Sequence, residues 1–336
     1  MVFRGMATLR AAGFAVCILG AAASTSGCES LLTGNEGNLL FSYEAVDELS
    51  DFNKPLAVGA KLDLRVREAG NRAEVDLLVA RSESADVLKV VDFTTKGPII
   101  LEGVADGTAR VAVRARLNSG VTVDDTVDMQ ARVPEVLKLR HVCSPDTEAA
   151  YFVDMDVLVP FDMELRTGKA LVGYGLHPVD VAPAAGVAFD DTSKDQENFH
   201  VRTSATPGLV TLSSQVDSNT LGMRLVNIGD IDGGGLSPAS LDDEVPVNAI
   251  GSVRVLPTVG GQYVCCPRTP MTVVTDTPET CEVLGLGEAT CLVAGFVTVR
   301  GKAEGDCKFR ASWAAGQGGA GLETSLTVPI VAAGTP

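Results

Sequence analysis

Eight cysteines carry most of the side-chain chemistry that this sequence offers. Cys17 and Cys28 lie near the amino terminus, and the other six are Cys143, Cys265, Cys266, Cys281, Cys291 and Cys307. Zinc templates need spacings such as Cys-x-x-Cys, which the chain lacks, and it has three histidines in all. The six cysteines are therefore predicted to form disulfides, as expected of an exported protein; free thiols are the alternative.

The order of the cysteines limits how they pair. Adjacent cysteines rarely bond to each other, so Cys265 and Cys266 are expected to take different partners. Cys143 has no companion in its own part of the chain, and if it pairs it must reach Cys265 or Cys266. The last three cysteines and the remaining member of the adjacent pair are then expected to close within the final third of the chain.

Nucleophilic catalysis requires a histidine held between a carboxylate and a serine or cysteine. The three histidines are His141, His177 and His200, with Asp180 close to His177 in sequence. No Gly-x-Ser-x-Gly, His-Glu-x-x-His, Walker or Ser-x-x-Lys motif accompanies them. We expect packing or surface histidines and no enzyme; an enzyme with a divergent site remains the alternative.

Two acidic clusters are weak calcium candidates, because hard cations take several oxygen ligands from a loop. One consists of Asp190, Asp191, Asp195 and Glu197, and the other of Asp230 and Asp232. Neither follows the spacing of a calcium loop, so solvated turns are the preferred interpretation. One Trp and four Tyr also offer little for a sugar platform. No cofactor is expected.

The segments that position these residues follow the period of strands. Residues 60–67, 108–114 and 121–129 alternate apolar and polar side chains, as half-buried strands do. Glycine and proline recur about every ten residues, and no long helical period is present. This pattern predicts an all-β chain of sandwiches or barrels.

A weak internal repeat divides the chain. The segment 62–65 is echoed at 163–166, and Gly107 is echoed by Gly208, both 101 residues later. A third echo begins at Gly305, 97 residues after Gly208. Because this period is the size of an immunoglobulin sandwich, we expect module 1 at 39–134, module 2 at 135–229, a Gly/Asp-rich linker at 230–244 and a Cys-rich module 3 at 245–333.

The first unit resembles bacterial immunoglobulin-like (Big-type) repeats. The resemblance rests on the glycine turn and alternating strand of residues 101–113 and on the early strand at 57–62. It implies two to three tandem immunoglobulin-like β-sandwich modules with a structural or adhesive role outside the cytoplasm. Fold-level resemblance leaves the ligand open.

Residues 1–27 have the parts of an export signal: Arg4 and Arg10, an apolar run over 11–23, and small residues before Cys28. The segment 25–28 (Thr-Ser-Gly-Cys) resembles the bacterial lipobox, in which the cysteine carries the lipid. Residues 28–38 would then form a tether. The alternatives are cleavage at Ala21-Ala22-Ala23, which releases a soluble protein, and an uncleaved anchor, for which the run is too short.

The formal charge of −16 argues against nucleic acid as a partner, because phosphate binding needs clustered Lys and Arg. The sequence thus predicts a lipid-anchored protein of a bacterial cell envelope, facing the periplasm or the exterior, that binds a protein or a surface polymer. A calcium- or glycan-binding module is the alternative function.

Overall fold

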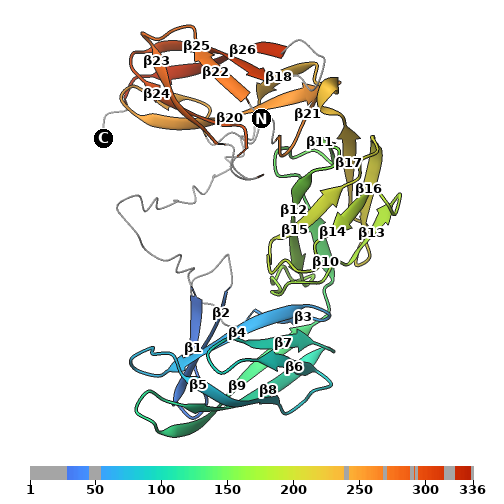
Figure 1. The fold of residues 1–336 in the computed structure, drawn as a ribbon, viewed down its shortest axis with the longest axis vertical. Helices are drawn as coiled ribbons and strands as arrows, with labels where there is room; N and C mark the ends of the chain where they lie inside the picture. Colours follow the sequence, from blue (N-terminus) through green and yellow to red (C-terminus); the bar gives the residue numbers. More distant parts are fainter. Residues whose placement is uncertain are drawn as a thin grey trace, which may run out of the picture.

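The computed structural model describes residues 29–44, 54–237, 242–267, 271–287, 291, 294–313 and 322–333. They form six β-sheets, which make three β-sandwich modules. Figure 1 shows the sandwiches following one another in an open arc, with module 2 in the middle. The all-β prediction is confirmed. Within the described residues, no helix is long and apolar enough to span a membrane.

Module 1 has a five-stranded sheet, β1-β2-β4-β7-β6, and a four-stranded sheet, β3-β9-β8-β5. Its strands are β1 (Glu29–Thr33), β2 (Leu39–Glu44), β3 (Leu56–Ala57), β4 (Lys61–Glu68), β5 (Asp76–Ser82), β6 (Leu88–Phe93), β7 (Ile99–Gly103), β8 (Gly107–Arg116) and β9 (Thr122–Arg132).

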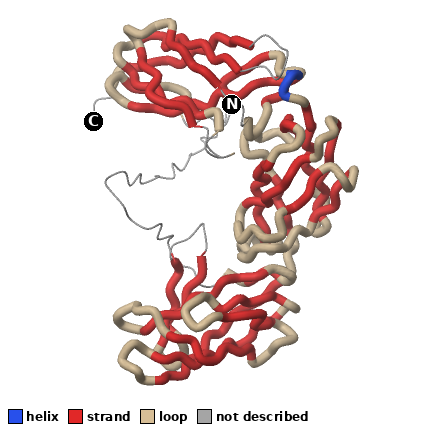
Figure 2. Tube along the Cα trace, viewed as in Figure 1, coloured by secondary structure: helices blue, strands red, loops and turns tan. Residues whose placement is uncertain are grey.

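Module 2 has the sheets β10-β12-β15-β14 and β11-β17-β16-β13. Its strands are β10 (Val136–Leu139), β11 (Glu148–Phe152), β12 (Asp156–Glu164), β13 (Val179–Ala182), β14 (Val187–Phe189), β15 (Asn198–Thr203), β16 (Gly208–Ser214) and β17 (Thr220–Val226). A single 3-10 turn, η1 (Ile228–Asp230), follows β17 and is the blue element of Figure 2.

Module 3 has the sheets β18-β20-β24-β23, with β21 paired to β20, and β19-β26-β25-β22. Its strands are β18 (Gly233–Leu236), β19 (Val245–Pro246), β20 (Ile250–Val259), β21 (Gln262–Tyr263), β22 (Met271–Thr275), β23 (Cys281–Gly287), β24 (Phe296–Gly301), β25 (Gly305–Trp313) and β26 (Leu322–Val331).

The three modules share one strand plan. In each, a short early strand pairs in parallel with the last strand: β3 with β9, β11 with β17, and β19 with β26. The glycines of the sequence repeat hold equivalent places, because Gly107, Gly208 and Gly305 begin β8, β16 and β25 with φ of 159°, 151° and 137°. The glycine echoes therefore mark a structural repeat. The echo of 62–65 at 163–166 does not, because the first segment begins β4 and the second lies at the end of β12.

A second repeated position was missed in the sequence. Gly59, Asp154 and Asn248 each lie in the turn between the short parallel strand and the strand that follows it, with φ of 91°, 56° and 65°. A left-handed residue is needed in that turn, and glycine, asparagine and aspartate adopt this conformation most readily. Because three different residue types occupy this position, a comparison of residue identities between the modules does not reveal the repeat.

The core is built by strict alternation along the long strands. In β8 every second side chain is buried, from Ala109 to Ala115, and the same holds for β12. One continuous apolar cluster runs through modules 1 and 2 and reaches Leu256 and the buried cysteines at the near end of module 3, whereas most of module 3 packs in a core of its own around Trp313. Apolar packing therefore continues from module to module at both junctions.

The structure differs from the sequence-based expectation at the start of module 1. Residues 29–33, expected to belong to a tether, form β1 at the edge of the first sheet. The loop that follows is fixed by the buried carboxylate of Asp125, which accepts hydrogen bonds from the backbone N–H groups of Glu36, Asn38 and Leu39 at 3.0, 2.8 and 2.7 Å. Burial raises the pKa of Asp125, but these bonds outweigh it and lower the pKa overall.

The structure also differs within the expected linker at 230–244. Gly233 to Leu236 form β18, which pairs with β20. A run of glycines has no alternation of apolar and polar side chains, so the sequence does not predict a strand here. The absence of side chains is nevertheless required for packing, because a Cβ on Gly234 would clash with the Trp313 ring. The glycine run lets the backbone of β18 lie directly on that ring.

Gly301→Ala is expected to destabilise module 3. A Cβ at this position would lie 2.7 Å from the carbonyl oxygen of Pro246 and 2.9 Å from Ile330 Cγ2, so β19 must shift. We expect a loss of about 1–3 kcal/mol, measured by urea unfolding with the fluorescence of Trp313, the single tryptophan. Gly285→Ala in β23 is the matched control, because a Cβ there meets nothing within 4 Å. Equal midpoints for the two variants would contradict the contact.

Candidate functional site

Among the described residues, no hydrogen bond joins any of the three histidines to a serine or cysteine side chain. His141 Nδ1 is 2.9 Å from the Tyr151 hydroxyl, and His177 Nδ1 is 3.4 Å from Asp191. His200 Nε2 is 2.9 Å from Asp195. Asp180, the sequence neighbour of His177, instead accepts a bond from Gln215. These contacts position the rings without completing a catalytic triad.

The acidic calcium candidates act as acceptors within turns. Asp190 accepts hydrogen bonds from Thr192, and Asp195 accepts them from the N–H groups of Glu197 and Asn198 at 2.9 Å. In the second cluster, Asp230 and Asp232 accept the N–H groups of Asn227 and Gly260. In the described part of the chain, no group of three or more His, Cys, Asp or Glu is arranged to hold a metal ion.

A cavity of about 520 Å³ lies against β14 and β15 of module 2. Its polar lining includes His200, Arg202 and Asp190. Arg202 is already bound by Asp154 and Asp156 at 2.7 and 3.1 Å, which neutralises its charge. With Asp190 beside them, the lining of the cavity carries more negative than positive charge.

The best-organised polar contacts lie where modules meet. Between modules 1 and 2, residues 172–174 bond to both sides of the β3–β4 turn. Ala57 N–H donates to Val172 O at 2.9 Å, and Lys61 and Tyr174 exchange two bonds of 2.9 Å each. Gly173, with φ of 129°, permits this approach, because a Cβ would lie 2.6 Å from that of Ala60.

Side chains reinforce the first junction. The carboxylate of Asp63 in module 1 accepts bonds from two groups of module 2, the hydroxyl of Tyr174 and Lys194 Nζ. Burial, followed by the neighbouring Asp63, raises the pKa of Tyr174, so its hydroxyl remains a donor. Lys54 is buried beside Glu197; burial lowers the pKa of Lys54, and burial with nearby Asp195 raises that of Glu197.

The second junction is covalent and cationic. Cys143 of module 2 bonds to Cys265 of module 3 across 122 residues of sequence. Beside it lies Arg254, only 2% exposed, whose guanidinium donates to the carbonyl oxygens of Val142 at 2.7 Å, Cys291 at 3.0 Å and Ala294 at 3.2 Å. A small apolar cluster, which includes residues from β11, β17 and β20, covers the same junction.

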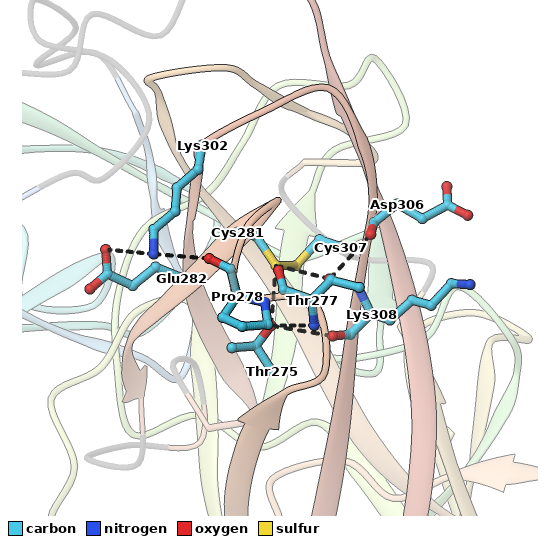
Figure 3. The surroundings of a disulfide bond; sticks show 9 residues. All are labelled: Thr275, Thr277, Pro278, Cys281, Glu282, Lys302, Asp306, Cys307 and Lys308. Carbon is cyan, nitrogen blue, oxygen red and sulfur yellow. Dashed lines mark hydrogen bonds and ion pairs between the residues drawn. A yellow bond between two sulfur atoms is a disulfide. The ribbon is translucent and has the colours of Figure 1, made fainter.

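The other two disulfides, Cys266–Cys291 and Cys281–Cys307, close within module 3. Figure 3 shows Cys281–Cys307 beside the turn that leads into β23. The Thr275 and Thr277 hydroxyls lie 3.5 and 3.9 Å from Cys281 Sγ, and Lys302 Nζ donates to the carbonyl of Pro278 at 3.1 Å. These six cysteines are buried, which is typical of structural disulfides. Cys28, the expected lipid attachment site, lies outside the described residues.

No known protein family and no curated protein matches the chain. Among solved structures, surface layer protein SbsC, domains 4–9, is similar at 15% identity and a TM-score of 0.27, over 91% of this chain and 47% of that one. The D00-D0 domain of intimin is similar at 12% identity and a TM-score of 0.21, over 58% of this chain and 100% of that one.

A third similar structure is the Bacteroides ovatus glucan-utilisation protein SGBP-B in complex with a mixed-linkage heptasaccharide. It matches at 8% identity and a TM-score of 0.23, over 82% of this chain and 66% of that one. The chain spans about half the length of the surface layer structure. At these scores the likeness concerns the all-β fold and carries no argument about function.

His141 is expected to make folding stability fall in acid. Burial lowers its pKa from 6.5 to about 4, an effect that outweighs the Thr147 backbone and Asp146, which raise it. Because the unfolded chain binds the proton more tightly, stability is lost as the pH falls from 6.5 towards 4, by about 3 kcal/mol at pH 4. The test compares urea unfolding at pH 7 and pH 4 for the wild type and His141→Asn. A loss of the same size in both would contradict the assignment.

Cys143→Ala/Cys265→Ala is expected to loosen module 3 from module 2, because within the described residues this disulfide is the only covalent link between the two modules besides the main chain. We expect faster proteolytic cleavage between residues 227 and 237 and a larger radius of gyration by small-angle scattering. The control, Cys281→Ala/Cys307→Ala, opens a 26-residue separation inside module 3. It should lower that module's stability by about 2–5 kcal/mol without changing the spacing between modules. An unchanged scattering profile for the first variant would argue against the link.

Proposed function

We propose that this chain is a non-catalytic, lipid-anchored protein of a bacterial cell envelope. It presents immunoglobulin-like modules for structural or adhesive binding to another protein or a surface polymer. Cys28 carries the lipid, and the modules lie on the periplasmic or outer side of the membrane. The disulfides support a location outside the cytoplasm, where such bonds persist.

The observation that carries this proposal is the construction of the two junctions. Modules joined by simple linkers move independently. Here, backbone bonds and Asp63 join the first pair, and a disulfide with buried Arg254 joins the second. Such junctions fix the orientation of successive modules relative to one another. A fixed orientation suits a protein that binds through the surfaces of its modules rather than one whose active-site cleft must open and close.

Side-chain chemistry supports the same proposal. Two of the buried polar groups have a structural role: Asp125 fixes the loop after β1, and Arg254 joins modules 2 and 3. The histidine–carboxylate contacts lack a nucleophile. The acidic surface, with a formal charge of −16, favours protein or polymer partners over nucleic acid.

Cys28→Ala is expected to abolish envelope association, since the lipid would have no attachment point. The measurement is membrane fractionation with mass spectrometry of the amino-terminal peptide. Cys17→Ala is the control, because it changes the other cysteine of the leader and should leave fractionation unchanged. Membrane association of Cys28→Ala at the wild-type level would refute the anchor.

The side of the envelope on which the modules lie is decided in the same cells by protease shaving. Peptides of modules 1–3 released from intact cells would place the modules on the exterior and favour adhesion or surface-polymer binding. Release only after the outer envelope is opened would place them in the periplasm.

A further inference from the structure

Strand β22 of module 3 is a sheet edge without the usual protection. Among the residues that the structure describes, it pairs with β25 alone, at the end of the order β19-β26-β25-β22. Its sequence, Met-Thr-Val-Val-Thr, has no charge, no proline and no register shift. Exposed edges of this kind are ready to pair with another strand, and proteins normally block them.

The direction of the hydrogen bonds shows which groups of β22 face outward. Asp276 N–H, directly after the strand, donates to Lys308 O of β25 at 2.8 Å. Because this direction alternates along a strand, Thr272 and Val274 also point their backbone groups at β25. The N–H and C=O groups of Met271, Val273 and Thr275 therefore point away from the sheet.

The equivalent edges of the other two modules are blocked. In module 1, β5 carries Asp76 and Arg81 and has a bulge between Leu77 and Val79. In module 2, β13 is only four residues long and contains Asp180. Three copies of one strand plan thus differ at this position, and within the described residues the module 3 copy alone combines an uncharged sequence with an unbroken register.

We propose that β22 pairs antiparallel with β22 of a second copy of this chain, forming a two-fold dimer with a continuous sheet across both module 3 sandwiches. Centred on Val273, the register sets Val273 opposite itself, Met271 opposite Thr275, and Thr272 opposite Val274. The outward-facing N–H and C=O groups of Val273 in one copy then bond to the C=O and N–H groups of Val273 in the other. Such a contact, in which the same surface of both copies is used, is isologous.

A second copy fits this edge because the strand is complementary to itself. Every cross-strand pair in this register joins β-branched or apolar side chains, which pair favourably. The nearest acidic group, Asp276, is bound by Arg310 at 2.9 Å, so no like charges meet at the ladder although each chain carries −16 overall. The edge is thus a place where two acidic chains approach without strong repulsion.

The size of the contact sets its strength. A five-residue ladder is smaller than a standard interface of about 1,600 Å², so the dimer is weak in free solution and favoured at high local concentration. The inference does not depend on the lipid anchor. It is tested on the oxidised chain without residues 1–28, and its failure would leave the proposed function standing.

The experiment is sedimentation velocity of the wild type from micromolar to millimolar concentration, compared with Thr272→Lys/Val274→Lys. Both positions are exposed, so the monomer tolerates lysine there. In the dimer, the lysine introduced at position 272 of each copy would face the lysine introduced at position 274 of the other, and like charges directly opposite destabilise a ladder. We expect a concentration-dependent dimer for the wild type and a dissociation constant about tenfold or more higher for the lysine variant.

A charge-swapped mixture makes the test specific. An equimolar mixture of the lysine variant with Thr272→Glu/Val274→Glu should restore dimers, and native mass spectrometry should show them as heterodimers. The matched control, Val121→Lys/Leu209→Lys, changes exposed residues of the other modules and should dimerise like the wild type. A wild type that stays monomeric at millimolar concentration, a lysine variant that dimerises equally well, or a mixture without heterodimers would each overturn the proposal.

Discussion

The buried guanidinium of Arg254 is the contact on which the joining of modules 2 and 3 depends. A cation taken out of water is tolerated only where polar groups replace its hydration. Three carbonyl oxygens do so here: Val142 in module 2, and Cys291 and Ala294 in module 3. The donors of one fork reach both modules, so separating the modules would break the hydrogen bond to Val142 O. The neighbouring disulfide holds the same backbone in place.

The modules repeat a single plan but differ in how each meets its surroundings. Where modules 1 and 3 bring Gly103 and Gly301 directly against the backbone of the short parallel strand, module 2 has Thr203. The hydroxyl of Thr203 donates to Phe152 O and accepts from Met155 N–H, at 2.8 and 2.9 Å. The contact between this position and the short parallel strand is thus a direct backbone approach in modules 1 and 3 and a bridging hydroxyl in module 2.

Alternation and glycine spacing sufficed to predict the all-β class and the period, because both follow from local geometry. Gly107, Gly208 and Gly305 recur in the sequence because the same backbone conformation, with positive φ, recurs at the start of the equivalent strand in each module. Strands β1 and β18 could not be predicted from their own residues, because distant residues stabilise them. Asp125 accepts the backbone hydrogen bonds of the loop after β1, and the Trp313 ring packs against the glycine run of β18. The junction contacts of Asp63 and Arg254 join residues about 110 or more positions apart, and charge and composition do not reveal such pairs.

The cysteine order has a consequence for biogenesis. A chain that crosses a membrane from its amino terminus exposes Cys143 to the oxidising side long before its partner, since 122 residues separate it from Cys265. Cys266, adjacent to that partner, arrives at the same moment, and its own partner Cys291 follows 25 residues later. Order of arrival does not distinguish two adjacent thiols, so in such a chain the position of Cys143 in the folded module 2, and not the sequence of translocation, selects Cys265 over Cys266.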